Sequence, residues 1–247
     1  MTAMPITRPR HWLRWLLAAI AGLVVLAAAG PFIYIHFFNS TPAALSLSQG
    51  NTSGNTSADT ASSAASANPA ATGSVAGTWT VGPGSVVGYR VNEVLLGQSA
   101  TAVGRTTSVT GHLTIAGSTV TAAAFSVPMA TVHSDKSQRD EQFDGRIMDV
   151  SQYPAGTFTL TRPIDLDPLP AGGVIKHFTA HGNLTLHGTT HAVTFTLTAE
   201  RKGSQLEVSG DIPVRFADYN IQNPSFAGFV TTQDHGLLEF LLVFNMT

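Results

Sequence analysis

The sequence predicts an all-β fold: an eight-stranded antiparallel barrel with one short amphipathic helix, preceded by a membrane-spanning helix and a linker. Three observations support this prediction. Apolar residues alternate with threonine along most of the chain after Thr78, one charge-rich segment interrupts the alternation, and an uncharged apolar run lies near the N-terminus. A period of two is typical of half-buried strands, and closing a sheet into a barrel removes its exposed edges. A two-layer sandwich is the alternative that the pattern leaves open.

The overall composition excludes several classes of protein. Charged residues make up 11% of the 247-residue chain, and the net charge is −2. Nucleic-acid binding needs a clustered basic face, and the last two thirds of the sequence contain no run of Lys or Arg. Because the chain has no cysteine, it can form neither a disulfide framework nor a thiolate metal site.

Residues 15–38 form an apolar run without a fixed charge. This run exceeds the roughly 20 residues that cross a bilayer as a helix. Three basic residues precede it, and none follows closely: Arg8, Arg10 and Arg14. The positive-inside rule therefore places residues 1–14 in the cytoplasm and the rest of the chain outside, on the periplasmic or cell-surface side of the cell membrane. A cleaved signal peptide ending near the alanines at 27–29 is the alternative, and it also exports the domain.

The predicted linker covers residues 39–77. It consists mostly of Ser, Thr, Ala, Asn and Gly, and Asp59 is its only charged residue. Such a composition buries too little apolar surface to offset the entropy of ordering, so we expect disorder. A flexible coil of this length spans roughly 35 Å between its ends.

The domain at residues 78–247 contains the alternating runs that we expect to form strands. They are residues 78–81, 86–91, 105–115, 119–128, 156–163, 174–187, 190–201, 204–216 and 236–245. The run at 236–245 is apolar on both faces. It therefore needs apolar cover from the barrel interior on one side and from a helix or loop on the other.

The segment 133–150 is rich in charge and breaks the alternation. Phe143 and Ile147 lie four residues apart, which is the spacing of one helical face. Ser134 or Asp135 can cap the helix at its N-terminus. The segment is therefore predicted to form a short amphipathic helix across an end or side of the barrel.

Several motifs in residues 77–247 together resemble the YceI-like family of exported bacterial lipid-binding barrels. They are Trp79–Val81, Arg139–Asp140, Gln152–Pro154, Thr157–Phe158, Gly182–Gly188, Arg215 and Asp218–Tyr219. This resemblance implies an elongated barrel of lipocalin-like architecture with an apolar tunnel that holds polyisoprenoid chains or isoprenoid quinones. Gly77-Thr78-Trp79 also has the Gly-x-Trp form that opens lipocalins, which are likewise apolar-ligand carriers.

The candidate ligand site is the apolar interior of the barrel. The inward side chains expected to line it are Leu113, Ile115, Phe125, Val127, Phe158, Leu160, Phe178, Leu184, Leu186, Val193, Phe195, Leu197, Val208, Ile212, Val214, Phe216, Phe240 and Leu242. Arg139, Asp140 and Arg215 are candidates for a head-group or rim site, because charge-assisted hydrogen bonds are strong. A structural ion pair that holds the helix to the barrel is the alternative for Arg139 and Asp140.

The sequence predicts neither an enzyme nor a bound metal or cofactor. Four histidines lie within fifteen residues: His177, His181, His187 and His191. On an extended strand the first two are about 13 Å apart, too far to share a zinc ion. No nucleophile elbow, phosphate loop or dinucleotide fingerprint is present. The resemblance to the YceI-like family implies a long-chain isoprenoid-type lipid as a partner, and the apolar run at 15–38 predicts the cytoplasmic membrane as the other. A structural module whose core is filled by its own side chains is the rival hypothesis.

Overall fold

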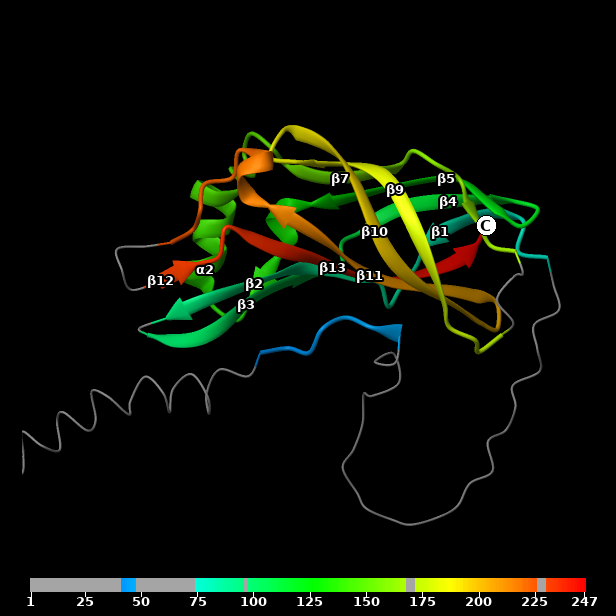
Figure 1. Cartoon of the computed structure of the whole chain (residues 1–247), viewed down its shortest axis with the longest axis horizontal. Coiled ribbons are helices and arrows are strands. Elements are labelled where there is room, and N and C mark those ends of the chain that lie inside the picture. Colours follow the sequence, from blue (N-terminus) through cyan, green and yellow to red (C-terminus); the bar gives the residue numbers. More distant parts are fainter. Residues whose placement is uncertain (1–40, 48–73, 96, 168–171, 226–229) are drawn as a thin grey trace, which may run out of the picture.

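A computed structural model describes residues 41–47, 74–95, 97–167, 172–225 and 230–247 (Figure 1). The predicted anchor at 15–38 lies outside these residues. Within the described ranges, none of the helices has the length and apolarity to cross a membrane.

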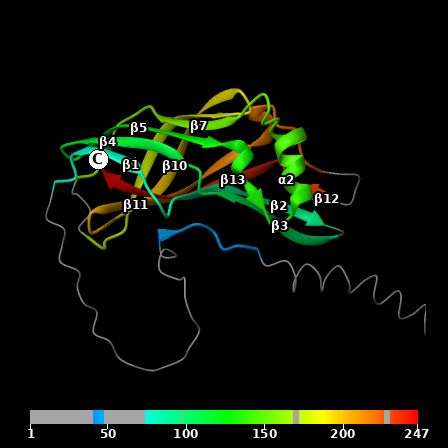
Figure 2. The same cartoon turned by 180° about the vertical axis from the view of Figure 1, so that it is seen from behind.

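Eight antiparallel strands form the closed barrel that the alternation predicted (Figures 1 and 2). In spatial order they are β1 (Gly77–Val81), β4 (Thr110–Ala116), β5 (Thr119–Pro128), β7 (Ala155–Leu160), β9 (Lys176–Leu186), β10 (Thr189–Lys202), β11 (Gln205–Arg215) and β13 (His235–Met246). Closure occurs where β1 pairs with β13 as well as with β4. A sandwich is therefore excluded.

The closure by β1 involves only the C-terminal part of β13. The N-terminal part of β13 pairs instead with β2, which begins a branch of three strands. This branch consists of β2 (Val86–Leu95), β3 (Gln98–Thr106) and β6 (His133–Ser134). Two short strands lie outside the main order, β12 (Val230–Thr232) on β2 and β8 (Ile164–Asp165) on β5.

The barrel therefore has two different ends. At the β1 end, the C-terminus and β1 complete the ring of strands (Figure 1). At the other end lie the β2–β3 turn, β12 and the helical segment, and we call this the α2 end. The helical segment consists of α2 (Ser137–Gln142) followed by a turn of π-helix, η3 (Phe143–Ile147). Phe143 stacks on Tyr89 of β2 with ring centroids 5.1 Å apart, which fixes the segment to the barrel.

Short helical turns complete the elements. They are η2 (Met129–Thr131) and η4 (Phe216–Tyr219). The β9–β10 hairpin turns at His187 and Gly188, whose φ angles of 47° and 71° match the two left-handed central residues of a type I′ turn. Tyr153 packs edge-on against His187 at 4.5 Å, so two motifs of the family resemblance lie in contact.

One predicted strand is wrong. The run at 105–115 is not continuous, because β3 ends at Thr106 and β4 begins at Thr110. Residues 98–104, for which no strand was predicted, belong to β3. This stretch is poor in large apolar side chains, so the alternation is too weak to reveal it. The short β12 was also not predicted.

Two parts of the predicted linker are packed on the barrel, whereas the composition predicts disorder. Residues 41–47, which we call the strap, run along the outside of the barrel (Figure 1). Leu47 at the end of the strap is 4% exposed. Residues 74–77 lead into β1, and Val75 there is 3% exposed.

Candidate functional site

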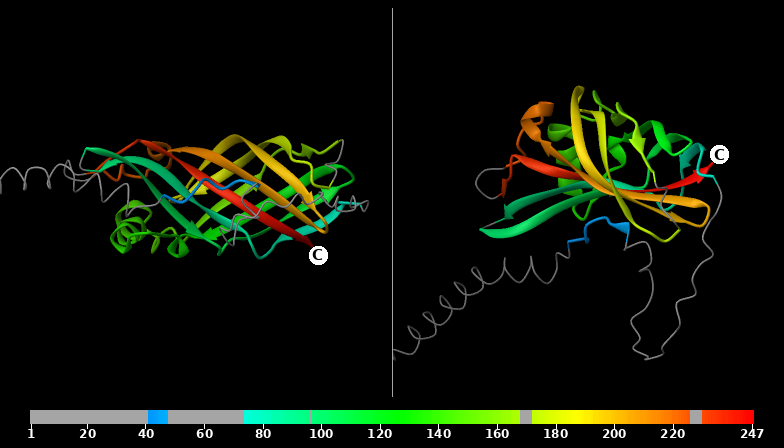
Figure 3. Two further views of the ribbon diagram at one scale, coloured as in Figure 1. Left: turned by 90° about the horizontal axis from the view of Figure 1, so that it is seen from below. Right: turned by 45° about the vertical axis from the view of Figure 1, so that its right-hand side comes forward.

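The barrel encloses an elongated cavity of about 700 Å³. Buried apolar residues form one cluster towards each end, and the cavity runs between and along both. Its lining reaches from Ile115 and Leu206 near the β1 end to Leu95 and Arg139 at the α2 end. Figure 3 (left) shows that the barrel is elongated in this direction. A volume of 300–1,000 Å³ is typical of ligand pockets.

The predicted tunnel residues lie along this cavity with one exception. Val193 packs against the core cluster at the α2 end but does not line the cavity. The residues that do line it are Leu113, Ile115, Phe125, Val127, Phe158, Leu160, Phe178, Leu184, Leu186, Phe195, Leu197, Val208, Ile212, Val214, Phe216, Phe240 and Leu242. They come from seven strands and η4, and two-residue alternation places them on the inner face.

Phenylalanine rings from four strands meet along the cavity. Phe195 lies edge-on to Phe158 at 5.6 Å and to Phe240 at 5.8 Å. Phe125 lies 6.4 Å from Phe158 and 5.8 Å from Phe244. These spacings are those of favourable aromatic pairs. The rings therefore form a connected apolar surface inside the barrel, which we call the aromatic belt.

The cavity opens at the α2 end. Four of its lining residues are exposed, and all four lie on α2 and η3: Gln138, Glu141, Gln142 and Arg146. The strand ladder also stops at β6 on this side, so the helical segment completes the wall there. The sequence indicated a charged helix across the barrel but not that these four residues border the opening. The charge-rich pattern of 133–150 is the signal that could have identified them.

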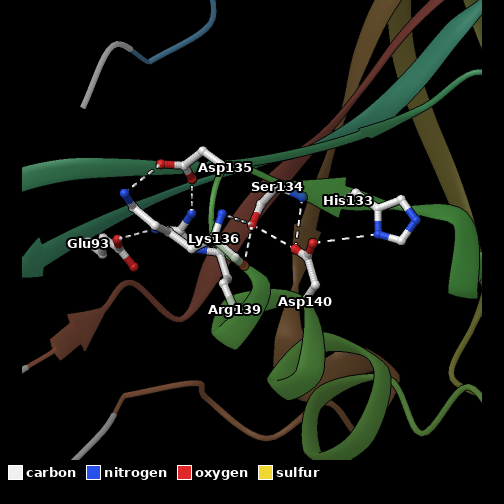
Figure 4. Close-up of polar contacts among 7 residues, drawn as sticks. All are labelled: Glu93, His133, Ser134, Asp135, Lys136, Arg139 and Asp140. Carbon is white, nitrogen blue, oxygen red and sulfur yellow. Dashed lines mark hydrogen bonds and ion pairs between the residues drawn. The ribbon is translucent and has the colours of Figure 1, made fainter. Parts of the chain in front are cut away.

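Arg139 lies at this mouth and is neutralised by two carboxylates (Figure 4). Its guanidinium forms ion pairs with Glu93 of β2, at 3.3 Å, and with Asp135. Burial alone would lower the pKa of Arg139, but the carboxylates of Glu93 and Asp135 outweigh it and raise that pKa. Arg139 thus lines the cavity and also ties α2 to β2.

Asp140 bonds to Ser134 and thereby holds α2 to β6 (Figure 4). Its Oδ1 accepts hydrogen bonds from the backbone N–H of Ser134 at 2.8 Å and from the Ser134 hydroxyl at 2.7 Å. His133 Nδ1 lies 3.5 Å from its other oxygen. These contacts are the structural role that the sequence left open for Asp140, and Asp140 is not among the lining residues.

Arg215, the third candidate for the rim, lies at the end of β11. It is exposed and is not part of the cavity wall. Arg215 lies opposite His235 where β11 pairs with β13. The pKa of Asp234 is lowered mainly by the hydrogen bond from His235, and the charge of Arg215 adds to this effect.

The clustered histidines take part in separate local contacts. His181 Nδ1 lies 2.9 Å from the Thr194 hydroxyl, and His187 Nδ1 lies 3.2 Å from the Tyr219 carbonyl. His191 packs edge-on against the Tyr219 ring at 5.1 Å. Within the described residues, no three His, Cys, Asp or Glu side chains converge as metal ligands would.

Comparison with known proteins finds one family and several similar folds. The chain matches 98% of a polyisoprenoid-binding domain from Saccharophagus degradans implicated in plant cell wall breakdown, over 68% of its own length, with 16% identity and a TM-score of 0.57. Burkholderia cenocepacia BcnA matches over 63% of this chain and 95% of its own, with 19% identity and a TM-score of 0.49. The Campylobacter jejuni YceI protein matches over 57% and 82%, with 13% identity and a TM-score of 0.48.

No curated protein is significantly similar to the chain in sequence. At these identities, the likeness to the Saccharophagus domain shows a common fold. The model of the YceI-like domain, however, matches residues 79–244, from the first barrel strand to the last. The chain therefore belongs to the YceI-like domain family.

Proposed function

We propose that this protein is a membrane-tethered binding protein that holds a long apolar amphiphile in its barrel, outside the cytoplasm. The ligand class is a polyisoprenoid or an isoprenoid quinone, which the protein carries or sequesters. The observation that carries the proposal is the elongated cavity of about 700 Å³ with its almost wholly apolar lining. A barrel that served only as a structural module would fill this space with its own side chains, because protein interiors are close-packed.

The shape and size of the cavity support a chain-like ligand. A dry apolar cavity of about 150 Å³ holds one benzene molecule, so a volume of 700 Å³ corresponds to about 25–30 carbons. The fold that the chain shares with a polyisoprenoid-binding domain also supports this ligand class. Several polar lining residues lie at the mouth, where the head group of such an amphiphile would lie: Gln138, Arg139, Glu141, Gln142 and Arg146.

Membrane tethering follows from the energetics of such a ligand. At about 0.8 kcal/mol per methylene, burial of a long tail is strongly favourable relative to water. The bilayer is equally apolar, so the cavity competes with the membrane rather than with water. Exchange must therefore occur at the membrane, and the predicted helix at 15–38 would keep the barrel there.

Solvent extraction of the purified protein followed by mass spectrometry tests the proposal. We expect one long-chain isoprenoid lipid per protein. Ala123 lines the cavity and its neighbour Ala122 is exposed, so these two residues of β5 make a matched pair. Ala123→Phe should occupy part of the cavity and lower the recovery of long-chain lipid, and Ala122→Phe should leave the recovery unchanged. A wild-type barrel that is empty, or equal recovery from both variants, would overturn the proposal.

A further inference from the structure

The strap crosses the outer face of the barrel over β13 and β2 (Figures 1 and 3). Two arginines hold it through its backbone. Arg90 Nη2 donates to the Pro42 carbonyl at 2.8 Å, and Arg105 donates to the Ala43 carbonyl. Leu47 is buried at the far end of the strap. Polar contacts at one end and apolar burial at the other therefore fix the direction in which the strap runs.

The two arginines belong to a cluster built around a buried carboxylate. Glu239 of β13 is 5% exposed and forms ion pairs with both Arg90 and Arg105. Two cations against one carboxylate leave an excess of donor groups, and the strap carbonyls accept hydrogen bonds from them. Charge-assisted hydrogen bonds of this kind are among the stronger polar contacts in proteins. The barrel surface is thus complementary to a backbone segment at this place.

The strap begins beside the mouth of the cavity. Thr41 and Pro42 line a small surface pocket together with Ser134 and Asp135. Ser134 is bonded to Asp140 of α2, and Asp135 is paired with Arg139 at the mouth. The chain therefore reaches the barrel at its α2 end and runs from there towards the β1 end (Figure 1).

From this arrangement we infer that the strap holds the α2 end of the barrel, with the cavity mouth, against the outer surface of the membrane. The inference rests on the proposed function, because it needs residues 15–38 to span the bilayer. Two residues separate Phe38 from Thr41, so the two Cα atoms are three steps apart, a distance of roughly 10 Å at full extension. A lipid surface is then within reach of the mouth.

The tip of the β2–β3 hairpin, at the same end, fits a lipid surface. Val94 there is 41% exposed and lies beside the cavity mouth, whereas the other exposed large apolar residues of the described chain, Val174, Ile175 and Met246, lie towards the β1 end, away from it. Leu95 follows it, lines the cavity and pairs with Val230 of β12. Apolar side chains beside the opening would enter the headgroup region and let a lipid tail pass without crossing water.

Single labelled cysteines test this orientation, because the natural chain has no cysteine. Val94→Cys lies at the α2 end, and Ser204→Cys lies in the exposed β10–β11 turn near the β1 end. Each full-length protein carries an environment-sensitive fluorophore and is reconstituted in phosphatidylethanolamine–phosphatidylglycerol vesicles containing a brominated lipid quencher. We expect quenching at position 94 and none at position 204. Equal quenching at both positions, or more at 204, would overturn the inference.

Two substitutions in the strap complete the test. Leu47→Asp should release the strap and remove the difference between the two labels, whereas Ala44→Asp, at an exposed strap position, should preserve it. A difference that persists in Leu47→Asp would show that the strap does not set the orientation. Flotation with the vesicles and recovery of bound lipid are measured on the same samples. Loss of flotation would overturn the anchor together with this inference, whereas flotation and bound lipid with equal quenching would overturn the inference alone.

Discussion

Glycine residues in the barrel wall make room for the rings of the aromatic belt. At Gly182 of β9, an added Cβ would overlap the ring of Phe158 and approach the Thr159 carbonyl to 2.7 Å. At Gly210 of β11, it would approach the Phe240 ring to 2.8 Å. These rings therefore lie over bare backbone, an arrangement that is known to support glycine within sheets.

We expect Gly182→Ala to destabilise the barrel by about 1–3 kcal/mol, because the Phe158 ring must leave its position. Gly145→Ala in η3 is the control, since its Cβ would meet no atom within 4 Å. Urea unfolding of both variants gives the two free energies of unfolding. Equal values would show that the Phe158 ring adapts without cost.

Tyr89 couples the stability of the α2 end to pH. Burial raises the pKa of its phenol to about 12, while the nearby charge of Arg139 acts in the opposite direction. The folded protein therefore holds the proton more tightly than the unfolded chain, whose phenol titrates near 10. The free energy of unfolding that the protonated Tyr89 phenol contributes is therefore fully present below pH 10. It is lost as the pH rises from about 10 to about 12. Tyr89→Phe should flatten this part of the curve of unfolding free energy against pH, as measured by denaturant titration across that range. An unchanged slope would mean that the pKa of Tyr89 is not higher in the folded protein than in the unfolded chain.

At the scale of elements, α2 is held to the barrel by side-chain contacts, those of Asp140 among them, rather than by its own helical propensity. The helix has six residues, and isolated helices of that length are unstable in water. Its cohesion with β6 comes from the two hydrogen bonds that Asp140 accepts from Ser134.

Removing this carboxylate should therefore loosen the segment that borders the mouth. For Asp140→Ala we expect amide hydrogen exchange in α2 and η3 to accelerate about tenfold, since each partly buried hydrogen bond contributes about 0.5–1.5 kcal/mol. Glu141→Ala removes the same charge from the adjacent, exposed position and should leave exchange almost unchanged. Similar acceleration in both variants would assign the effect to net charge. Mass-spectrometric exchange on the folded protein distinguishes the two results.

The elements that could be predicted from sequence are those with strong alternation. β9, β10 and β11 fall close to their expected ranges because apolar residues alternate with polar ones along them, and β5 and β13 do so because each is a mainly apolar run. β3 could not be found, because small residues such as Ala100, Ala102 and Gly104 give no clear period. The strap could not be found either: its binding depends on Arg90 and Arg105, which lie far away in sequence. The double-faced apolar pattern of 236–245 did indicate that β13 needs cover outside the barrel.

The candidate site also contains residues that a local sequence pattern predicts and residues that it does not. All but one of the residues predicted to face inward line the cavity, because alternation decides which side chains face a closed interior, but other lining residues such as Tyr89, Val120 and Phe244 were not predicted. The mouth could not be derived in this way. Arg139 and Asp140 are neighbours in sequence, yet one borders the cavity and the other bonds to β6. This difference depends on how one short helix turns relative to the barrel, which no local pattern specifies.

At the scale of the whole molecule, the exposed residues of the cavity lining lie at the α2 end, whereas a cluster of buried apolar side chains lies towards the β1 end. A tail that enters at the mouth meets the aromatic belt and then the apolar cluster around Trp79, which is 1% exposed. The depth available to a ligand is therefore limited, and only a head group can remain near α2 and η3.

This limit predicts how affinity depends on the length of the ligand. The cavity of 700 Å³ accommodates about 25–30 carbons, or five to six isoprene units. Each unit added up to that length buries more apolar surface, and each further unit stays outside the barrel. We therefore expect the thermal unfolding temperature of the delipidated protein, measured with saturating isoprenoid alcohols, to rise with chain length and then level off at five to six units. Ala123→Phe shortens the available space and should move the plateau to fewer units, whereas Ala122→Phe should not move it. A continued rise beyond eight units would mean that the barrel widens on binding, and no dependence on length would mean that the tail lies elsewhere.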